Sequence, residues 1–167
     1  MFYPAGQHRD AGLPHDPLKA IVAPRPIGWI STLDAAGRAN LAPYSFFNMV
    51  QTSPAMVMFG SDGLKHTAAN AIATGEFVFN LATRPLFDAM NASSAALADG
   101  ESEFEHAGLE RAPCRIVQAP RVAASPASLE CKVVHALQLH DVDGRALHGH
   151  VVIGQVVGVH IAEEALK

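Results

Sequence analysis

The sequence predicts a mainly β protein whose antiparallel strands form a barrel or a sandwich, with helices confined to two insertions. About six or seven segments combine β-branched and aromatic residues with flanking breakers, and Asp/Gly turns separate several of them. An alternating α/β fold would instead need a helix after almost every strand. The 167 residues show no fixed-period repeat and no linker, so we expect one domain over 1–167.

The first part of the chain is expected to form an irregular arm and then a strand. Residues 1–19 contain five Pro or Gly residues, which break any regular period and indicate an irregular N-terminal arm. The run 20–33 is rich in β-branched and aromatic residues, but Pro24 and Pro26 exclude its first half from a central strand. We therefore expect this strand to begin near Ile27.

The next segments are expected to form strands around one short helix. Residues 34–37 supply the Asp and Gly of a hairpin turn, after which 39–44 should return antiparallel. Residues 55–60 are typical of a short apolar strand. Residues 66–74 have the alanine content and apolar spacing of a short helix with a glycine as its stop, and strand character resumes over 76–82.

A second helical insertion is expected before the last strands. Residues 85–98 place Leu and Met among alanines, and the Asp-Gly pair at 99–100 should end this helix. A shorter helical or looped piece is expected over 102–109. The segment 114–126 carries repeated prolines, which indicates an irregular crossing at an edge.

The chain is expected to close with a long hairpin. Residues 128–141 form the longest strand candidate, and the Asp-Gly pair at 143–144 provides a turn into the β-branched run 148–161. The helices thus stay between strands, as an antiparallel barrel or sandwich requires.

Charge, hydropathy and cysteine content exclude several classes of function. The net charge is −4, the sequence pI is about 6.1, and no Lys/Arg run occurs, so nucleic acid is not an expected partner. No apolar run approaches the ~18 residues of a membrane span, and the N-terminus lacks the pattern of a secretory signal. Cys114 and Cys131 are expected to be buried or half-buried thiols in a reducing compartment, which favours a cytoplasmic location.

The segment 42–48, APYSFFN, predicts a binding surface for a flat cofactor. Small residues let backbone N–H groups approach a ligand, Tyr44 and Phe46 offer flat surfaces, and Ser45 and Asn48 offer hydrogen bonds. A planar, phosphate-bearing cofactor would use all of these properties. The residues therefore lead to the hypothesis of a flavin site, at a place where a barrel strand is expected to fray into a loop.

The phosphate of such a cofactor has candidate ligands near the predicted helix. Neither a GxGxxG nor a GxxxxGK[ST] pattern is present. A Lys, hydroxyl groups and the N–H groups of a helix N-terminus could together hold a phosphate dianion. Thr67 could instead cap the helix while Lys65 is solvated, and on residue types alone this second interpretation is favoured. The candidates are Ser31, Thr32, Ser45, Lys65, Thr67 and Asn70.

Metal and acid–base chemistry find little support in the sequence. His148 and His150 share a strand face, but no third ligand falls at a zinc-like spacing near them, so no metal is expected. A nucleophile elbow is absent, and the cysteines lie beside apolar strand residues, where structural roles are common.

Six ordered motifs resemble the flavin reductase-like family of FMN-binding split barrels. The likeness covers the chain from about residue 19 onward and implies a six-stranded antiparallel, Greek-key-like split barrel that is a homodimer with FMN at the dimer interface. The motifs are RPIGWIST (25–32), NLAPYSFFN (40–48), KHTAAN (65–70), TGEFVFNL (74–81), SEFEHAGL (102–109), and SLEC (128–131) with HVVIGQVV (150–157).

The resemblance also implies roles for individual residues. The phosphate and ribityl candidates named above become the expected ligands, and His66 stands where an Asp is common in the family. His150 matches a histidine near the flavin and the nicotinamide. The residues expected beside the isoalloxazine ring are Ala42, Pro43, Tyr44, Ser45, Phe46 and Asn48.

The activity implied by the likeness is hydride transfer from NADH or NADPH to FMN, with reduced flavin passed to a partner monooxygenase. The cofactor would carry this chemistry, which fits the lack of catalytic carboxylates. An FMN-bound electron carrier of the flavoredoxin type, without nicotinamide activity, is the alternative. A pyridoxamine phosphate oxidase-like or heme-handling split barrel is a more remote one.

Overall fold

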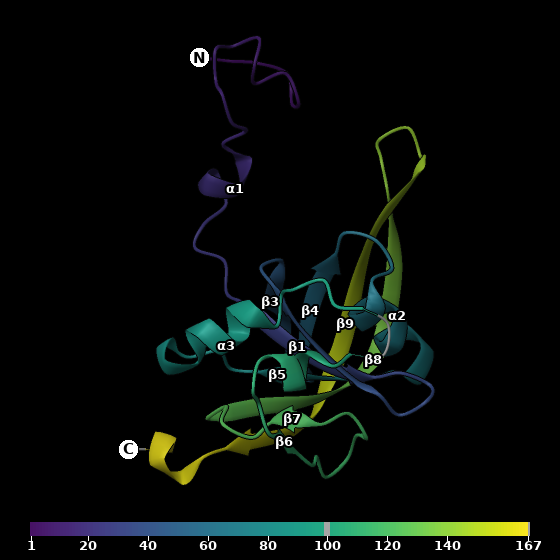
Figure 1. The fold of residues 1–167 in the computed structure, drawn as a ribbon. Coiled ribbons are helices and arrows are strands. Elements are labelled where there is room, and N and C mark those ends of the chain that lie inside the picture. Colours follow the sequence, from purple (N-terminus) through teal and green to yellow (C-terminus); the bar gives the residue numbers. More distant parts are fainter. Residues whose placement is uncertain (99–100, 167) are drawn as a thin grey trace.

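The computed structural model describes residues 1–98 and 101–166 and centres on one antiparallel sheet of seven strands (Figure 1). The strand order is β2-β1-β5-β8-β9-β4-β3. The strands are β1 (Gly28–Leu33), β2 (Ala39–Tyr44), β3 (Phe47–Thr52), β4 (Ala55–Ser61), β5 (Glu76–Asn80), β8 (Ala127–His140) and β9 (Ala146–Ile161).

Short helices and a small second sheet complete the described chain. The two-stranded sheet pairs β6 (Arg111–Ala112) with β7 (Arg121–Val122). No helix among the described residues is long and apolar enough to cross a bilayer. The helices are α1 (Leu18–Ile21), α2 (His66–Thr74), η1 (Arg84–Leu86), α3 (Phe87–Ala92), α4 (Glu103–His106) and η2 (Glu163–Leu166).

The sheet curls because its two edge strands are consecutive in the chain. Only Ser45 and Phe46 separate β2 from β3, so the two edges must meet. Phe47 lies against Gly28 of β1, where a Cβ atom would stand 2.4 Å from the Phe47 ring. The N–H of Gly60 donates to the carbonyl of Phe46 at 2.7 Å. These contacts bring β1, β3 and β4 together at the closure.

Apolar side chains from both halves of the curled sheet fill its interior. Phe59 meets Phe77 edge to face with ring centroids 5.3 Å apart, and Phe47 stacks on Phe79 at 4.7 Å. α2 packs against this core with Ala68 and Ala71, both fully buried. The helix therefore lies against the barrel interior at a defined position.

Most predicted elements are confirmed, several of them to within a residue or two. The strand 39–44 and the helix 66–74 have the predicted bounds, and Gly75 ends the helix with φ 74°. The long hairpin is β8 and β9, with a glycine of positive φ in its turn. Residues 1–17 have no helix or strand, as expected of an irregular arm, and α1 begins at Leu18. Figure 1 shows this arm and α1 projecting away from the sheet.

Two expectations about the elements need correction. The main sheet has seven strands, one more than the six that the resemblance implies, and β3 (Phe47–Thr52) begins inside the segment 42–48 where fraying into a loop was expected. Only the first residue of β3 is buried, so it lacks the alternating pattern that reveals a strand. The helix expected over 85–98 ends at Ala92. Its predicted stop at 99–100 lies outside the described residues.

Ser93 explains the early end of that helix. Its hydroxyl accepts a hydrogen bond from the indole Nε1 of Trp29 at 2.9 Å and donates to the carbonyl of Met90 at 2.7 Å. Trp29 is fully buried, so its N–H needs a partner inside the protein. The hydrogen bond between Trp29 and Ser93 thus ends the helix early, although the alanine-rich sequence after Ser93 favours a longer helix.

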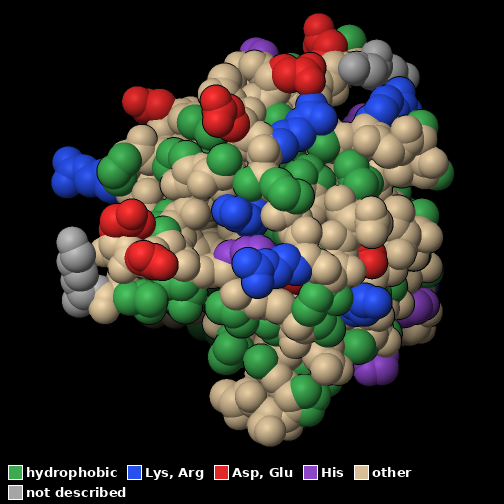
Figure 2. Space-filling view, turned by 90° about the horizontal axis from the view of Figure 1, so that it is seen from below, with side chains coloured by type: hydrophobic (Ala, Val, Ile, Leu, Met, Phe, Trp, Pro, Cys, Tyr) green, Lys and Arg blue, Asp and Glu red, His purple; other side chains and the backbone are tan. Residues whose placement is uncertain are grey.

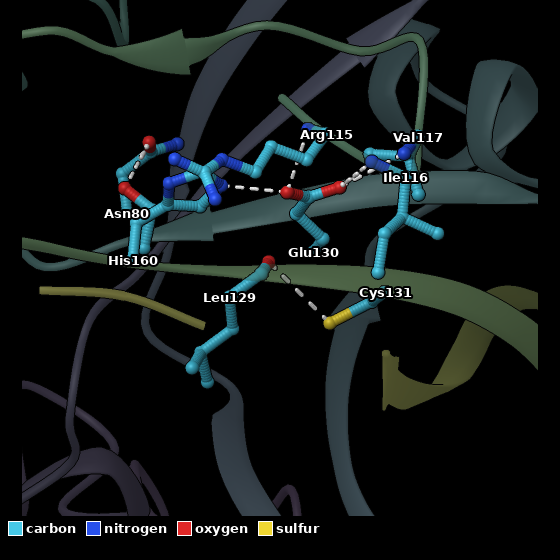
Figure 3. Close-up of polar contacts among 9 residues, drawn as sticks. Asn80, Arg115, Ile116, Val117, Leu129, Glu130, Cys131 and His160 are labelled. Atoms are coloured by element: carbon cyan, nitrogen blue, oxygen red, sulfur yellow. Dashed lines mark hydrogen bonds and ion pairs between the residues drawn. The ribbon is translucent and has the colours of Figure 1, made fainter. Parts of the chain in front are cut away.

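Glu130 of β8 holds the irregular segment that precedes β7 (Figure 3). One carboxylate oxygen accepts from the backbone N–H of Arg115 at 2.9 Å and from Nε2 of His160 at 2.6 Å. The other accepts from the N–H groups of Ile116 and Val117 at 2.7 and 2.9 Å. The Glu130 side chain is fully buried, and all its acceptor positions are used.

Asn80 of β5 makes a second polar anchor nearby. Its amide donates to the carbonyl of Trp29 and to the Ser31 hydroxyl, and its oxygen accepts from the N–H of Val122 and the hydroxyl of Ser128. The side chain is fully buried, so each of these bonds replaces one lost to water. Asn80 thereby joins β1, β5, β7 and β8.

Glu130 should make stability depend on acid pH. Burial opposes its ionisation, but the three backbone N–H donors and His160 outweigh burial and lower the pKa of this carboxyl to about 2, from 4.5 in an unfolded chain. Its contribution is present above pH 4.5 and is lost as the pH falls toward 2. Urea unfolding should therefore show a fall in the free energy of unfolding over this interval.

The Glu130→Gln variant tests the origin of this fall. We expect it to be less stable than wild type at pH 7 and to lose less stability between pH 4.5 and 2. Asp88→Asn, at an exposed position of α3, serves as the control and should keep the wild-type pH dependence. An unchanged pH dependence in Glu130→Gln would contradict the assignment.

Candidate functional site

A cavity of about 590 Å³ lies where the β1–β2 turn, the start of α2 and the segment before α4 meet. Its wall combines charged and amide side chains with small alanines. The lining residues are Asp34, Arg38, Ala39, Asn40, Leu64, Lys65, His66, Asn70, Ala95, Ala96, Leu97, Ala98, Glu101 and Glu103.

The N-terminus of α2 opens into this cavity without a side-chain cap. Lys65 is the N-cap residue in an extended conformation, and no side chain bonds to the first N–H groups of the helix. Thr67 does not cap the helix, since its hydroxyl accepts from the Asn40 amide at 2.7 Å. The first turn of α2 therefore keeps backbone donors that have no partner within the helix.

Lys65 is the cation of this cavity that has no ion pair with any described residue. Arg38 also lines the cavity, but its Nε lies 2.6 Å from an oxygen of Asp34. The backbone N–H of Arg38 is the largest influence that lowers the pKa of Asp34. Glu103 accepts from the N–H of Leu41 at 3.1 Å. Lys65 and the helix N-terminus are thus the positive groups of this cavity that remain without an ionic partner, beside the carboxylates of Glu101 and Glu103.

The two hydroxyls predicted on β1 do not line the cavity, and only Thr32 contacts a residue that does. Ser31 donates to the carbonyl of Pro120 at 2.5 Å and accepts from Asn80, while Thr32 accepts from the amide of Asn70 at 3.3 Å. Both hydroxyl residues are fully buried. Ser31 is therefore a structural anchor, and Thr32 orients Asn70, which lines the cavity.

The predicted ring-binding residues follow β2 away from this cavity and into β3. Tyr44 packs on Phe59 with ring centroids 5.0 Å apart, and burial raises the pKa of its phenol against the opposing effect of the Thr67 and Ser61 hydroxyls. Phe46 is 51% exposed, and the Arg25 guanidinium lies 5.9 Å from its ring centroid.

The other residues of this segment are small or polar and do not present a flat ring. Ala42, Pro43 and Ser45 are half-buried, and Asn48 is exposed. The side-chain oxygen of Asn48 accepts from the N–H of Met49 at 2.9 Å, which leaves its amide nitrogen free. None of these residues is among those that line the cavity.

His150 lies on β9, opposite Ser61 of the neighbouring β4. Its Nδ1 is 2.8 Å from the carbonyl of His148, and the side chain is half-buried. Ser61 is also one of the hydroxyls beside Tyr44. The predicted histidine and the predicted ring segment are thus linked through one β4 residue, while His150 does not line the cavity.

The fold also brings together groups that sequence spacing did not reveal. Arg38 and Asn40 join the cavity through the β1–β2 turn. Cys114, Glu130 and His160 place possible metal-ligand atoms within 4.8 Å of one another. Burial and the Glu130 charge raise the pKa of Cys114 to about 12, and Glu130 already accepts four hydrogen bonds. Glu130 in this cluster therefore anchors the backbone of residues 115–117.

Comparisons with known proteins agree with the geometry. A family model described as the flavin reductase like domain matches residues 22–167. An uncharacterised protein of Deinococcus radiodurans is 37% identical over 158 residues, which cover 89% of this chain and 66% of that protein. The chain thus spans about two thirds of this relative's length.

Solved structures of similar fold carry related descriptions. Nitrilotriacetate monooxygenase component B from Bacillus cereus has a TM-score of 0.84 and 26% identity, with 98% of this chain and 83% of that chain covered. A flavin-reductase-like protein with a split barrel domain from Shewanella frigidimarina has a TM-score of 0.81 and 23% identity, with 100% and 83% covered. The second likeness concerns the fold alone. The family match and the shared architecture confirm the predicted resemblance: the chain belongs to the flavin reductase-like family.

Proposed function

We propose that this protein binds FMN and passes a hydride to it from NADH or NADPH. The observation that carries the proposal is the uncapped N-terminus of α2, which meets Lys65 at the wall of the 590 Å³ cavity, where Lys65 makes no ion pair with a described residue. A helix N-terminus together with a Lys side chain favours a phosphate group. The phosphate distinguishes FMN from riboflavin, so the cavity provides the means to select the phosphorylated flavin.

Residues around this cavity would hold the phosphate and the ribityl chain. Lys65 supplies charge, the N–H groups of His66 and Thr67 supply backbone donors, and the Asn70 amide is oriented by Thr32. Ser31 and Thr67 are not direct ligands in this proposal, since the Ser31 hydroxyl is bonded to Pro120 and Asn80 and the Thr67 hydroxyl accepts from Asn40. Ser45 remains a proposed ligand at the far end of β2.

The isoalloxazine ring is proposed to lie along the segment 42–48. Half-buried Tyr44 and exposed Phe46 give flat contacts, and the free amide of Asn48 can reach a ring heteroatom. The bound flavin supplies the electron-accepting chemistry. The protein's part is to hold the two rings at contact distance, and His150 is proposed to contact them near the nicotinamide.

We propose two protein partners for this reaction: a monooxygenase that receives the reduced flavin, and a second copy of this chain. Reduced flavin would pass to a partner monooxygenase, in a cytoplasmic setting. A second copy of the chain is proposed to cover apolar side chains that a soluble monomer would leave in water. These are Met49 and Val50 on β3 and Leu137, Leu139 and Leu147 on the β8–β9 hairpin, each between 43% and 51% exposed.

Sedimentation equilibrium tests the dimer. Wild type should return twice the 17.7 kDa chain mass, because burial of these apolar side chains would outweigh the cost of association. Leu137→Asp should shift the mass toward the monomer and weaken FMN binding at the interface. Val142→Asp, at the fully exposed hairpin tip, is the matched control. A monomeric wild type would remove the second copy from the proposal.

An absorbance experiment tests the activity. The purified protein, mixed with FMN and passed through a desalting column, should retain the flavin bands, and anaerobic NADH or NADPH should bleach them. Retained flavin that neither nicotinamide bleaches would favour the electron carrier. Absorbance of a heme Soret band, or oxidation of an amine substrate, would favour the remote alternatives. Failure to take up flavin would overturn both leading functions.

Lys65 should discriminate between FMN and riboflavin. Lys65→Ala removes a charged partner of the phosphate, so the Kd for FMN should rise about 10-fold or more while that for riboflavin stays roughly constant. Flavin fluorescence titration measures both. Lys132→Ala, at an exposed position of β8, should bind both flavins as wild type does. Equal weakening of the two flavins by Lys65→Ala would exclude Lys65 from the phosphate site.

A further inference from the structure

A second cavity of about 470 Å³ lies between the 115–126 segment and the end of β9. It shares no lining residue with the cavity at α2. The face seen in Figure 2 lies beneath β6 and β7 of Figure 1, and basic and histidine side chains gather around a hollow at its centre. The polar side chains of the lining are Arg115, Arg121, Ser125, Glu130 and His160.

The charges of this second cavity are unbalanced. Neither Arg115 nor Arg121 makes an ion pair or a side-chain hydrogen bond with any residue that the structure describes. The Nε of Arg121 is buried without a partner. A buried, unsatisfied guanidinium N–H is costly unless a ligand supplies an acceptor.

The one carboxylate among the described lining residues offsets only one of the two arginine charges and has no acceptor position left for a guanidinium group. Glu130 accepts three backbone N–H groups and His160 Nε2, which uses its acceptor positions. Figure 3 shows the Arg115 side chain extending in the direction of His160, while its backbone N–H bonds to Glu130. The cavity thus keeps two guanidinium groups for an outside partner, on a chain whose net charge is −4.

The donor set defines the class of ligand. A guanidinium presents parallel N–H groups that match two oxygens of a phosphate or a carboxylate, and metal cations would be repelled. The volume falls in the range of small-molecule sites and excludes a macromolecule from the interior. We propose that this cavity binds a small oxyanion, a phosphate or carboxylate group, through Arg115 and Arg121, independently of the flavin site.

Calorimetric titration of the full chain in a low-salt buffer tests this site. Inorganic pyrophosphate and malonate are the two probes, since one carries phosphate and the other carboxylate oxygens. Binding of either probe supports the proposal, and the probe with the lower Kd shows whether the site prefers phosphate or carboxylate. If neither probe binds at millimolar concentration, the proposal is overturned.

Variants then locate the binding. Arg115→Gln should raise the Kd of the probe about 10-fold, and the double variant Arg115→Gln with Arg121→Gln should abolish measurable binding. Arg115 is exposed, so its single variant tests the site even if Arg121→Gln disturbs folding. Arg84→Gln, on the exposed side of η1, should bind as wild type does.

Lys65→Ala separates this site from the proposed flavin phosphate site. The proposal requires that Lys65→Ala keep the wild-type affinity for the probe while the Arg115 variant loses it. The reverse result would assign the probe to the α2 cavity and overturn the second site. The outcome is independent of nicotinamide oxidation, so this site and the flavin reductase activity can fail separately.

Discussion

Closure of the sheet between β2 and β3 is the constraint on which the other features depend. The two edges are joined by only two residues, so an open sheet of this strand order cannot lie flat. Close contact at the closure needs Gly28 because the Phe47 ring occupies the space of a Cβ atom there. The alanines of α2 then pack against the aromatic core of the closed sheet.

Two buried polar side chains connect this barrel to its irregular parts. Asn80 and Glu130 each satisfy backbone groups of the segment before or within β7, which would otherwise be buried without partners. Such fully bonded groups tie a loop firmly to a sheet without regular secondary structure. Arg115 and Arg121 of the same segment line the second cavity without an ion pair to any residue that the structure describes.

The proposed flavin contacts divide naturally between the two ends of β2. At one end, Asn40 fixes Thr67 near the start of α2, and at the other end Tyr44 and Phe46 lead into the closure. The strand therefore connects the cavity at α2, the proposed phosphate site, to the aromatic segment. In the proposed arrangement the protein positions a cofactor that carries the chemistry.

The sequence by itself determined the hairpins, the helix 66–74 and the family, because turn residues, periodicity and ordered motifs are local signals. It also indicated Lys65, His66 and Asn70, which the structure brings to one cavity. Only the tertiary structure decided that β3 is a strand, since its exposed residues carry no pattern and its identity comes from pairing with β4. It also decided that Ser31 is bonded to Pro120 and Asn80, far away in the chain. Such contacts depend on how distant segments meet, and no local pattern records them.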